Sequence, residues 1–188
     1  MKLAKNILRK HSEIAFTLLE LLIVLAIIAL LASITFGTAG AVKEARMKST
    51  AKAELTLLSQ ALESYKFQYG DYPITSESEE NSLTLSKSLL GYKDAKYTKS
   101  FIDASRVYYE GDIPIEYDYS SMEFIRFIDP WGNSYQYFYK DSSEWDNFDF
   151  ILYSKGPNGM DLTLPKDGLI DYDFNNTEEN ADNIYIQN

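Results

Sequence analysis

Glu20 occupies a position that is hard to explain unless it has a chemical role. It is the only charged residue among the 21 residues from 16 to 36, which read FTLLELLIVLAIIALLASITF. A carboxylate inside lipid costs roughly several kcal/mol unless it is paired. We therefore expect Glu20 to have a functional partner. The alternative is an acid near the helix end that reaches toward the membrane surface or is protonated.

A second group of carboxylates lies near the C-terminus. The stretch DGLIDYD, residues 167–173, has the acidic composition of a calcium loop but not the spacing of an EF-hand. Calcium takes about six to eight oxygen ligands, which a flexible acidic loop can supply. A solvated acidic loop is the alternative, because a chain with this many acids places carboxylates together by chance.

The residue types that most enzymes use are scarce. The chain has no cysteine and a single histidine, His11, so it has no disulfide, thiolate metal site or cysteine nucleophile. It also lacks a glycine-rich phosphate loop and the spacing of a zinc site. We therefore do not expect an enzyme.

Charge is distributed unevenly along the 188 residues. Residues 1–36 hold four basic and two acidic residues, which leaves 14 basic and 26 acidic residues after them, a net charge of −12. Surfaces that bind DNA or RNA need clustered Lys and Arg. The acidic body therefore argues against nucleic acid as a partner, and the length of the chain suits one domain.

The apolar run predicts a helix that continues well beyond it. As a helix, residues 16–36 would span roughly 30 Å, about the thickness of a bilayer core, so we expect one membrane crossing. Gly70 and Pro73 supply a stop. Between these regions apolar residues recur at steps of three and four, as on one face of an amphipathic helix: Ala51, Leu55, Leu58, Leu62, Tyr65 and Tyr69. A secretory signal peptide, cleaved between residues 32 and 40, is the alternative for the apolar run.

The rest of the chain has the character of short strands. Residues 83–105 show only weak helical patterning, whereas later runs are rich in Tyr, Phe and Ile with partial alternation. Pro130, Gly132 and Asn133 in DPWGN suit a tight turn, so the strands on either side can form a hairpin. The predicted strands are residues 106–110, 113–119, 124–128, 134–139 and 148–153. The expected class is α+β, a long N-terminal helix packed on a small antiparallel sheet.

The N-terminal residues resemble a known family. A leader rich in Lys and Arg, a small residue, then FTLLE and an unbroken apolar helix resemble the signal of type IV pilins and of the pseudopilins of type II secretion. The resemblance implies that a prepilin peptidase cuts between Ala15 and Phe16 and methylates the new amine. Glu20 then becomes the fifth residue, able to pair with the Phe16 amine of a neighbouring subunit. His11 is removed with the leader, and Ala15 stands where the family usually has Gly.

Three later stretches sharpen this resemblance: LESYKFQYGDYPIT (62–75), DPWGNSYQYFY (129–139) and FDFILYSKGPNG (148–159). In that order they resemble the major pseudopilin of type II secretion. In that family the loop after the third stretch binds calcium through carboxylates and backbone carbonyls, and Asn158 stands where the family has Asp. The calcium site implied for this chain draws on Lys155, Asn158, Asp161, Asp167, Asp171, Asp173 and Asp182.

The resemblance implies an organisation and a function. It implies a cleaved leader (1–15), a transmembrane assembly helix (16–36), its amphipathic continuation (37–70) and a globular domain (71–188). The chain would be a single-pass protein of the inner membrane, with its globular domain outside the cytoplasm. It would polymerise with itself and meet minor pseudopilins, an inner-membrane assembly platform and the prepilin peptidase. A type IV pilus subunit and a membrane-anchored binding module that does not polymerise are the alternatives.

Overall fold

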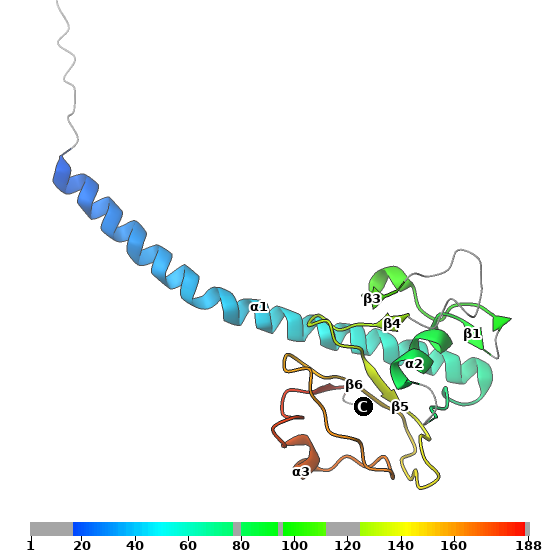
Figure 1. The fold of residues 1–188 in the computed structure, drawn as a ribbon. Coiled ribbons are helices and arrows are strands. Elements are labelled where there is room, and N and C mark those ends of the chain that lie inside the picture. The colour runs from blue at the N-terminus through cyan, green and yellow to red at the C-terminus, as the bar shows by residue number, and fades with distance from the viewer. Residues whose placement is uncertain (1–16, 77–79, 94–95, 112–124, 187–188) are drawn as a thin grey trace, which may run out of the picture. The chain divides into compact units, whose positions relative to one another are not determined.

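The computed structural model describes residues 17–76, 80–93, 96–111 and 125–186 (Figure 1). The chain divides into two compact units, Met1–Lys43 and Glu44–Asn188. Helix α1 (Leu18–Tyr69) begins in the first unit and ends in the second. The predicted leader, residues 1–15, lies outside the described residues.

Helix α1 confirms the predicted continuous helix. Its 52 residues are dominated by Leu, Ala, Glu and Lys, which are good helix formers. The helix ends at Tyr69 because Gly70 adopts φ of 89°, a conformation that glycine enters without strain. The Gly70 N–H donates to the Lys66 carbonyl at 2.7 Å, which closes the last turn.

In the first unit, the side chains of residues 18–31 are exposed around the whole circumference of α1. All of them except Glu20 are apolar. The described residues contain no helix that combines the length and the apolar character needed to cross a membrane.

In the second unit, α1 buries one face. Leu55, Leu58 and Leu62 are at most 1% exposed, while Phe67 is 93% exposed on the other side. The buried face carries the predicted spacing of three and four residues and belongs to the main hydrophobic core. The amphipathic part of the helix prediction is therefore confirmed.

Between α1 and the C-terminal sheet the chain forms several short elements. These are α2 (Asn81–Leu89), β1 (Tyr92–Lys93), β2 (Lys96–Tyr97), a 3-10 turn (Ala104–Arg106), β3 (Tyr109–Glu110) and β4 (Arg126–Phe127). The β1–β2 and β3–β4 pairs are both antiparallel. Figure 1 shows α2, β4 and β5 beside the second half of α1.

The largest sheet has three antiparallel strands in the order β5 (Gln136–Phe138), β6 (Ile151–Ser154) and β7 (Ile184–Tyr185). In its register Tyr137 lies opposite Leu152, and Ser154 lies opposite Ile184. Between β6 and β7 the chain makes a long excursion that contains the short helix α3 (Tyr172–Asn175). The α+β class is confirmed, and among the described residues the strands form three small sheets.

The DPWGN turn forms as predicted. Gly132 has φ of 93°, and its N–H donates to the Asp129 carbonyl at 2.9 Å. Asp129 also accepts the backbone N–H groups of Trp131 and Asn133 through its Oδ1 atom. An antiparallel bridge between Ile128 and Ser134 closes the turn, so the chain reverses direction between β4 and β5 as it does in a β-hairpin.

The strands are shorter than the sequence runs that predicted them. The run at residues 134–139 contains β5, but the N–H of Tyr139 donates to the Thr75 hydroxyl instead of continuing the ladder. Similarly, the Tyr135 N–H donates to the Phe127 carbonyl. The predicted strand at residues 113–119 lies outside the described residues.

A buried carboxylate sits where α1 meets the sheet. Glu54 is 5% exposed, and its Oε2 accepts a hydrogen bond of 2.6 Å from the hydroxyl of Tyr135, which is fully buried. Burial raises the pKa of Glu54; the Tyr135 hydrogen bond opposes this rise, and the nearby charge of Asp129 adds to it. The folded state therefore binds the Glu54 proton more tightly than the unfolded state does. This preference stabilises the fold at low pH, and the stabilisation is lost as the pH rises through the pKa that Glu54 has in the folded state.

We predict that Tyr135→Phe destabilises the fold by about 1–3 kcal/mol near neutral pH, because it leaves the buried Glu54 carboxylate without its donor. The loss should be smaller at about pH 4, which is below the ordinary pKa of a Glu side chain, because Glu54 is then protonated and the lost hydrogen bond matters less. Chemical unfolding at both pH values measures it.

The matched control is Tyr108→Phe, because Tyr108 is 67% exposed. This variant should unfold like the parent chain at both pH values. If Tyr135→Phe lowered the free energy of unfolding by the same amount at both pH values, the charge on Glu54 would not be involved.

Candidate functional site

The N-terminus of α1 is closed by a reciprocal pair of side chains. The Thr17 backbone N–H and the Thr17 hydroxyl both donate to Glu20 Oε2 at 2.9 Å. In return the Glu20 backbone N–H donates to the Thr17 hydroxyl at 3.2 Å. This is a capping box, which satisfies donors that the first turn of a helix leaves free.

The capping box adds a role for Glu20 that the sequence interpretation missed. The signal was present, because TLLE at residues 17–20 has the Thr-x-x-Glu spacing of a capping box. A Glu in the first turn also interacts favourably with the helix dipole. Both side-chain hydrogen bonds end on Oε2, and within the described part of the chain no hydrogen bond to Oε1 is found. The predicted cleavage residues, Ala15 and Phe16, lie outside the described residues.

The surroundings of Glu20 are apolar and exposed. Leu18 is 84% exposed, Leu19 66% and Leu22 59%. Exposed apolar surface of this extent marks an interaction with lipid or with another protein. The described residues therefore place one carboxylate in an exposed apolar helix surface.

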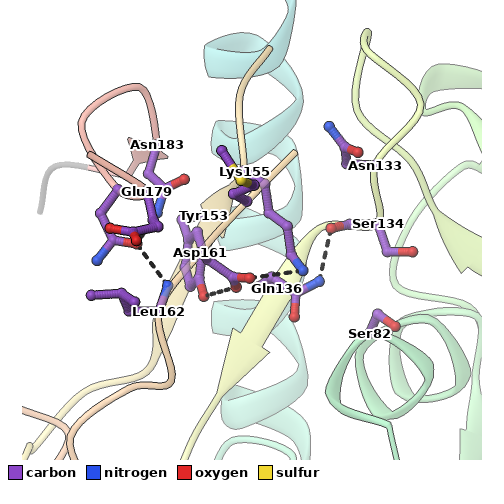
Figure 2. Close-up of polar contacts among 12 residues, drawn as sticks. Ser82, Asn133, Ser134, Gln136, Tyr153, Lys155, Asp161, Leu162, Glu179 and Asn183 are labelled. Carbon is purple, nitrogen blue, oxygen red and sulfur yellow. Dashed lines mark hydrogen bonds and ion pairs between the residues drawn. The ribbon is translucent and has the colours of Figure 1, made fainter. Parts of the chain in front are cut away.

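The other candidate residues lie in the loop between β6 and β7. Directly after β6, the Lys155 ammonium lies 2.9 Å from Asp161 Oδ1. The other Asp161 oxygen accepts a hydrogen bond of 2.7 Å from the Tyr153 hydroxyl. Figure 2 shows the Lys155 and Tyr153 side chains meeting at the Asp161 carboxylate. The Lys155 side chain is thus a partner of Asp161.

Asn158 joins the two ends of this loop. Its backbone N–H donates to Asp182 Oδ2 at 2.9 Å, and its side-chain NH₂ donates to the Glu179 carbonyl at 3.1 Å. Its side-chain oxygen accepts the Met160 N–H at 2.7 Å. Both polar ends of the Asn158 amide are therefore already used within the chain.

The close approach of the two loop ends requires glycine at residue 156. Gly156 has φ of 65°, and a Cβ atom there would lie 2.3 Å from the Asp182 carbonyl oxygen. The Gly156 carbonyl in turn accepts a hydrogen bond of 2.9 Å from the Asn133 side chain, in the DPWGN turn. The loop is thus fixed to both β7 and the turn before β5.

The remaining acids of the predicted calcium set serve the backbone locally. Asp167 Oδ1 accepts the Leu169 N–H at 3.0 Å. Asp171 caps α3 by accepting the Phe174 N–H at 2.8 Å. Asp173 lies in the first turn of α3. These bonds are typical of turns and helix caps.

The described residues do not fit calcium as a ready-made set of ligands. No three carboxylate or histidine side chains among them lie close enough to hold a metal ion. In the excursion between β6 and β7, three side-chain oxygens are buried without a hydrogen-bond partner in the described structure: Asn175 Oδ1, Asp182 Oδ1 and Asn183 Oδ1. Three such oxygens still fall short of the roughly six to eight that calcium takes. The described residues thus leave these acids apart from one another, and the calcium site stays a prediction.

Comparisons with known proteins agree with the N-terminal features. Residues 11–36 match the family described as "Prokaryotic N-terminal methylation motif". The chain is 26% identical over 132 residues to the type II secretion system core protein G of Aeromonas hydrophila, covering 69% of this chain and 75% of that protein. Against the protein of the same name from Escherichia coli K12 it is 29% identical over 146 residues, covering 77% and 81%.

A third relative of the same name, from Vibrio cholerae, is 27% identical over 155 residues, covering 81% of this chain and 86% of the relative. No solved structure matches the chain at comparable significance. The chain is thus similar over most of its length to the type II secretion system core protein G of three bacteria, and its N-terminus carries the methylation motif.

Proposed function

We propose that this chain is the structural subunit of a type II secretion pseudopilus, which polymerises through the first part of α1 to drive protein export. One observation carries the proposal: residues 18–31 present apolar side chains all round the helix, with Glu20 as the only charge. The chain is not an enzyme, in keeping with relatives that are named as core proteins of a secretion system.

The apolar helix surface suits two environments in turn. The methylation motif indicates anchoring in a membrane by the N-terminal helix, where lipid would cover the exposed leucines and isoleucines. In a filament the same side chains would pack against the helices of other subunits. Because lipid is as apolar as these side chains, exchange between the two changes little hydrophobic energy, and a polar contact is left to select the filament.

Glu20 supplies that polar contact in our proposal. Cleavage before Phe16 would create a new amine four residues ahead of Glu20 in each subunit. The capping box holds the carboxylate through Oε2 and leaves Oε1 for a donor from outside the chain. The Phe16 amine of a neighbouring subunit is a suitable donor, because an ion pair in an apolar environment is strongly favoured over an unpaired charge.

The location and partners follow from this assembly. We propose a single-pass protein of the inner membrane with its globular domain outside the cytoplasm. Its partners would be further copies of itself, minor pseudopilins, the inner-membrane assembly platform and the prepilin peptidase. The acidic surface of the globular domain would keep it soluble beside the filament.

We predict cleavage between Ala15 and Phe16, followed by methylation of the new amine. The reason is the basic leader followed at once by FTLLE. Intact-mass and N-terminal analysis of the protein isolated from membranes should find N-methyl-Phe16 as the first residue. A mature protein that begins near Gly40 would instead show removal of a secretory signal peptide, and it would contradict the proposed function.

We predict that Glu20→Gln prevents filament growth while membrane insertion and cleavage continue. Gln keeps the capping box but removes the charge, and the lost charge-assisted hydrogen bond costs about 1.5–3 kcal/mol per contact. A cost of that size lowers the equilibrium constant for adding each subunit by roughly tenfold or more. Negative-stain microscopy of sheared surface filaments, with immunoblots of processed subunit as a loading check, measures the effect.

The matched control is Thr17→Ala. It removes the capping hydroxyl, at a cost of about 1 kcal/mol, and leaves the Glu20 charge in place. Filaments should still form from this variant. Filaments from Glu20→Gln in normal number, or their loss in Thr17→Ala alone, would show that Glu20 acts only as a helix cap.

A further inference from the structure

The Lys155–Asp161 ion pair lies at the start of the loop between β6 and β7. The two charged atoms are 2.9 Å apart, and the side chains are only 24% and 20% exposed. Water screens such a pair less than it screens one on the open surface. Lys155 therefore compensates the negative charge of the partly buried Asp161 carboxylate.

Asp161 is held rigidly from its other side. The Tyr153 hydroxyl that donates to it belongs to a ring that is 1% exposed. That ring stacks at 6.3 Å on Phe138 and lies 5.0 Å from the ring of Tyr185, so it is fixed by strands on both sides. Burial raises the pKa of Tyr153, which keeps its hydroxyl protonated as a donor. The position of Asp161 is thus set by the sheet itself.

The positive charge of Lys155 also reaches a second acid. The hydrogen bond from Arg126 holds the pKa of Glu80 below its usual range, and the charge of Lys155 adds a smaller effect in the same direction. Lys155 thus pairs directly with Asp161 and acts only weakly on Glu80.

Asn158 stands where the family that the chain resembles has Asp, so a neutral amide that can donate hydrogen bonds replaces a negative carboxylate. Its NH₂ group donates to the Glu179 carbonyl, while its backbone N–H binds Asp182. A carboxylate at this position has no proton to donate at neutral pH, and it would add negative charge beside Asp182. The Asn158 amide therefore joins the two ends of the loop without adding a negative charge.

We propose that Lys155 takes the place of a bound metal in this loop. The Lys155 ammonium pairs with Asp161, and the Asn158 side-chain amide donates to the Glu179 carbonyl. These two contacts hold the segment between β6 and β7 closed without calcium. The consequence is a globular domain whose stability does not depend on calcium. This proposal does not rest on filament assembly, so either one can fail without the other.

The first test is thermal unfolding of the full-length chain in detergent, followed by tryptophan fluorescence in chelator and in millimolar calcium. Trp145 reports on the loop, because its ring packs beside Gly168. The midpoint should be the same in both solutions. A rise of several degrees in calcium, with none in magnesium, would overturn the proposal and restore a calcium site.

The second test removes the internal cation. Lys155→Met should lower the midpoint by several degrees in chelator, because Asp161 loses its partner, while Lys155→Arg should keep most of the stability. Lys166→Met is the control, since Lys166 is exposed in the same loop and forms no ion pair within the described structure. Equal midpoints for Lys155→Met and Lys166→Met would overturn the proposal.

A double variant separates the pair from general packing. If Lys155 and Asp161 act on each other, Lys155→Met combined with Asp161→Asn should lose clearly less than the sum of the two single losses. Asn158→Asp should also melt below the parent chain in chelator, because it loses the donor to the Glu179 carbonyl. Additive losses in the double variant, or an unchanged midpoint for Asn158→Asp, would contradict the assigned roles.

Discussion

Burial of one face of the second half of α1 is the contact on which the rest of the globular unit depends. Leu55, Leu58 and Leu62 are almost completely inaccessible, and they share one core with α2, β4, β5 and β6. The sheets are too small to be stable alone, because pairs of two-residue strands bury little surface by themselves. The helix therefore supplies the apolar surface against which each short strand is fixed.

This constraint explains why polar groups are buried at the contact. The Glu54 carboxylate binds Tyr135, and the Ser154 hydroxyl binds Asp129 Oδ2 at 2.5 Å. Such bonds fix the register of short strands that have few ladder hydrogen bonds. Asp129 organises the DPWGN turn through its other oxygen, so one side chain links the turn, the start of the hairpin and the end of β6.

The sequence predicted the features that depend on local spacing. The bounds of α1, its buried face and the DPWGN turn follow from apolar steps of three and four, from Gly70 and from turn residues. Helix α2 could not be predicted firmly, because it buries polar residues such as Ser86, whose hydroxyl donates to the Ile125 carbonyl. The Lys155–Asp161 pair also depends on how a loop folds back, which charge pattern alone does not specify. The capping box, in contrast, was visible in TLLE.

The two halves of α1 thus have different uses: the second half organises a globular domain, and the first half offers an exposed apolar surface with one carboxylate. The measurement that tests this account most directly is an electron cryo-microscopy map of filaments assembled from the processed chain. The account predicts that Glu20 of each subunit lies within hydrogen-bonding distance of the Phe16 amine of a neighbour, inside a core formed by residues 18–31. A filament in which Glu20 contacts only its own Thr17, with subunits joined through their globular domains, would contradict it.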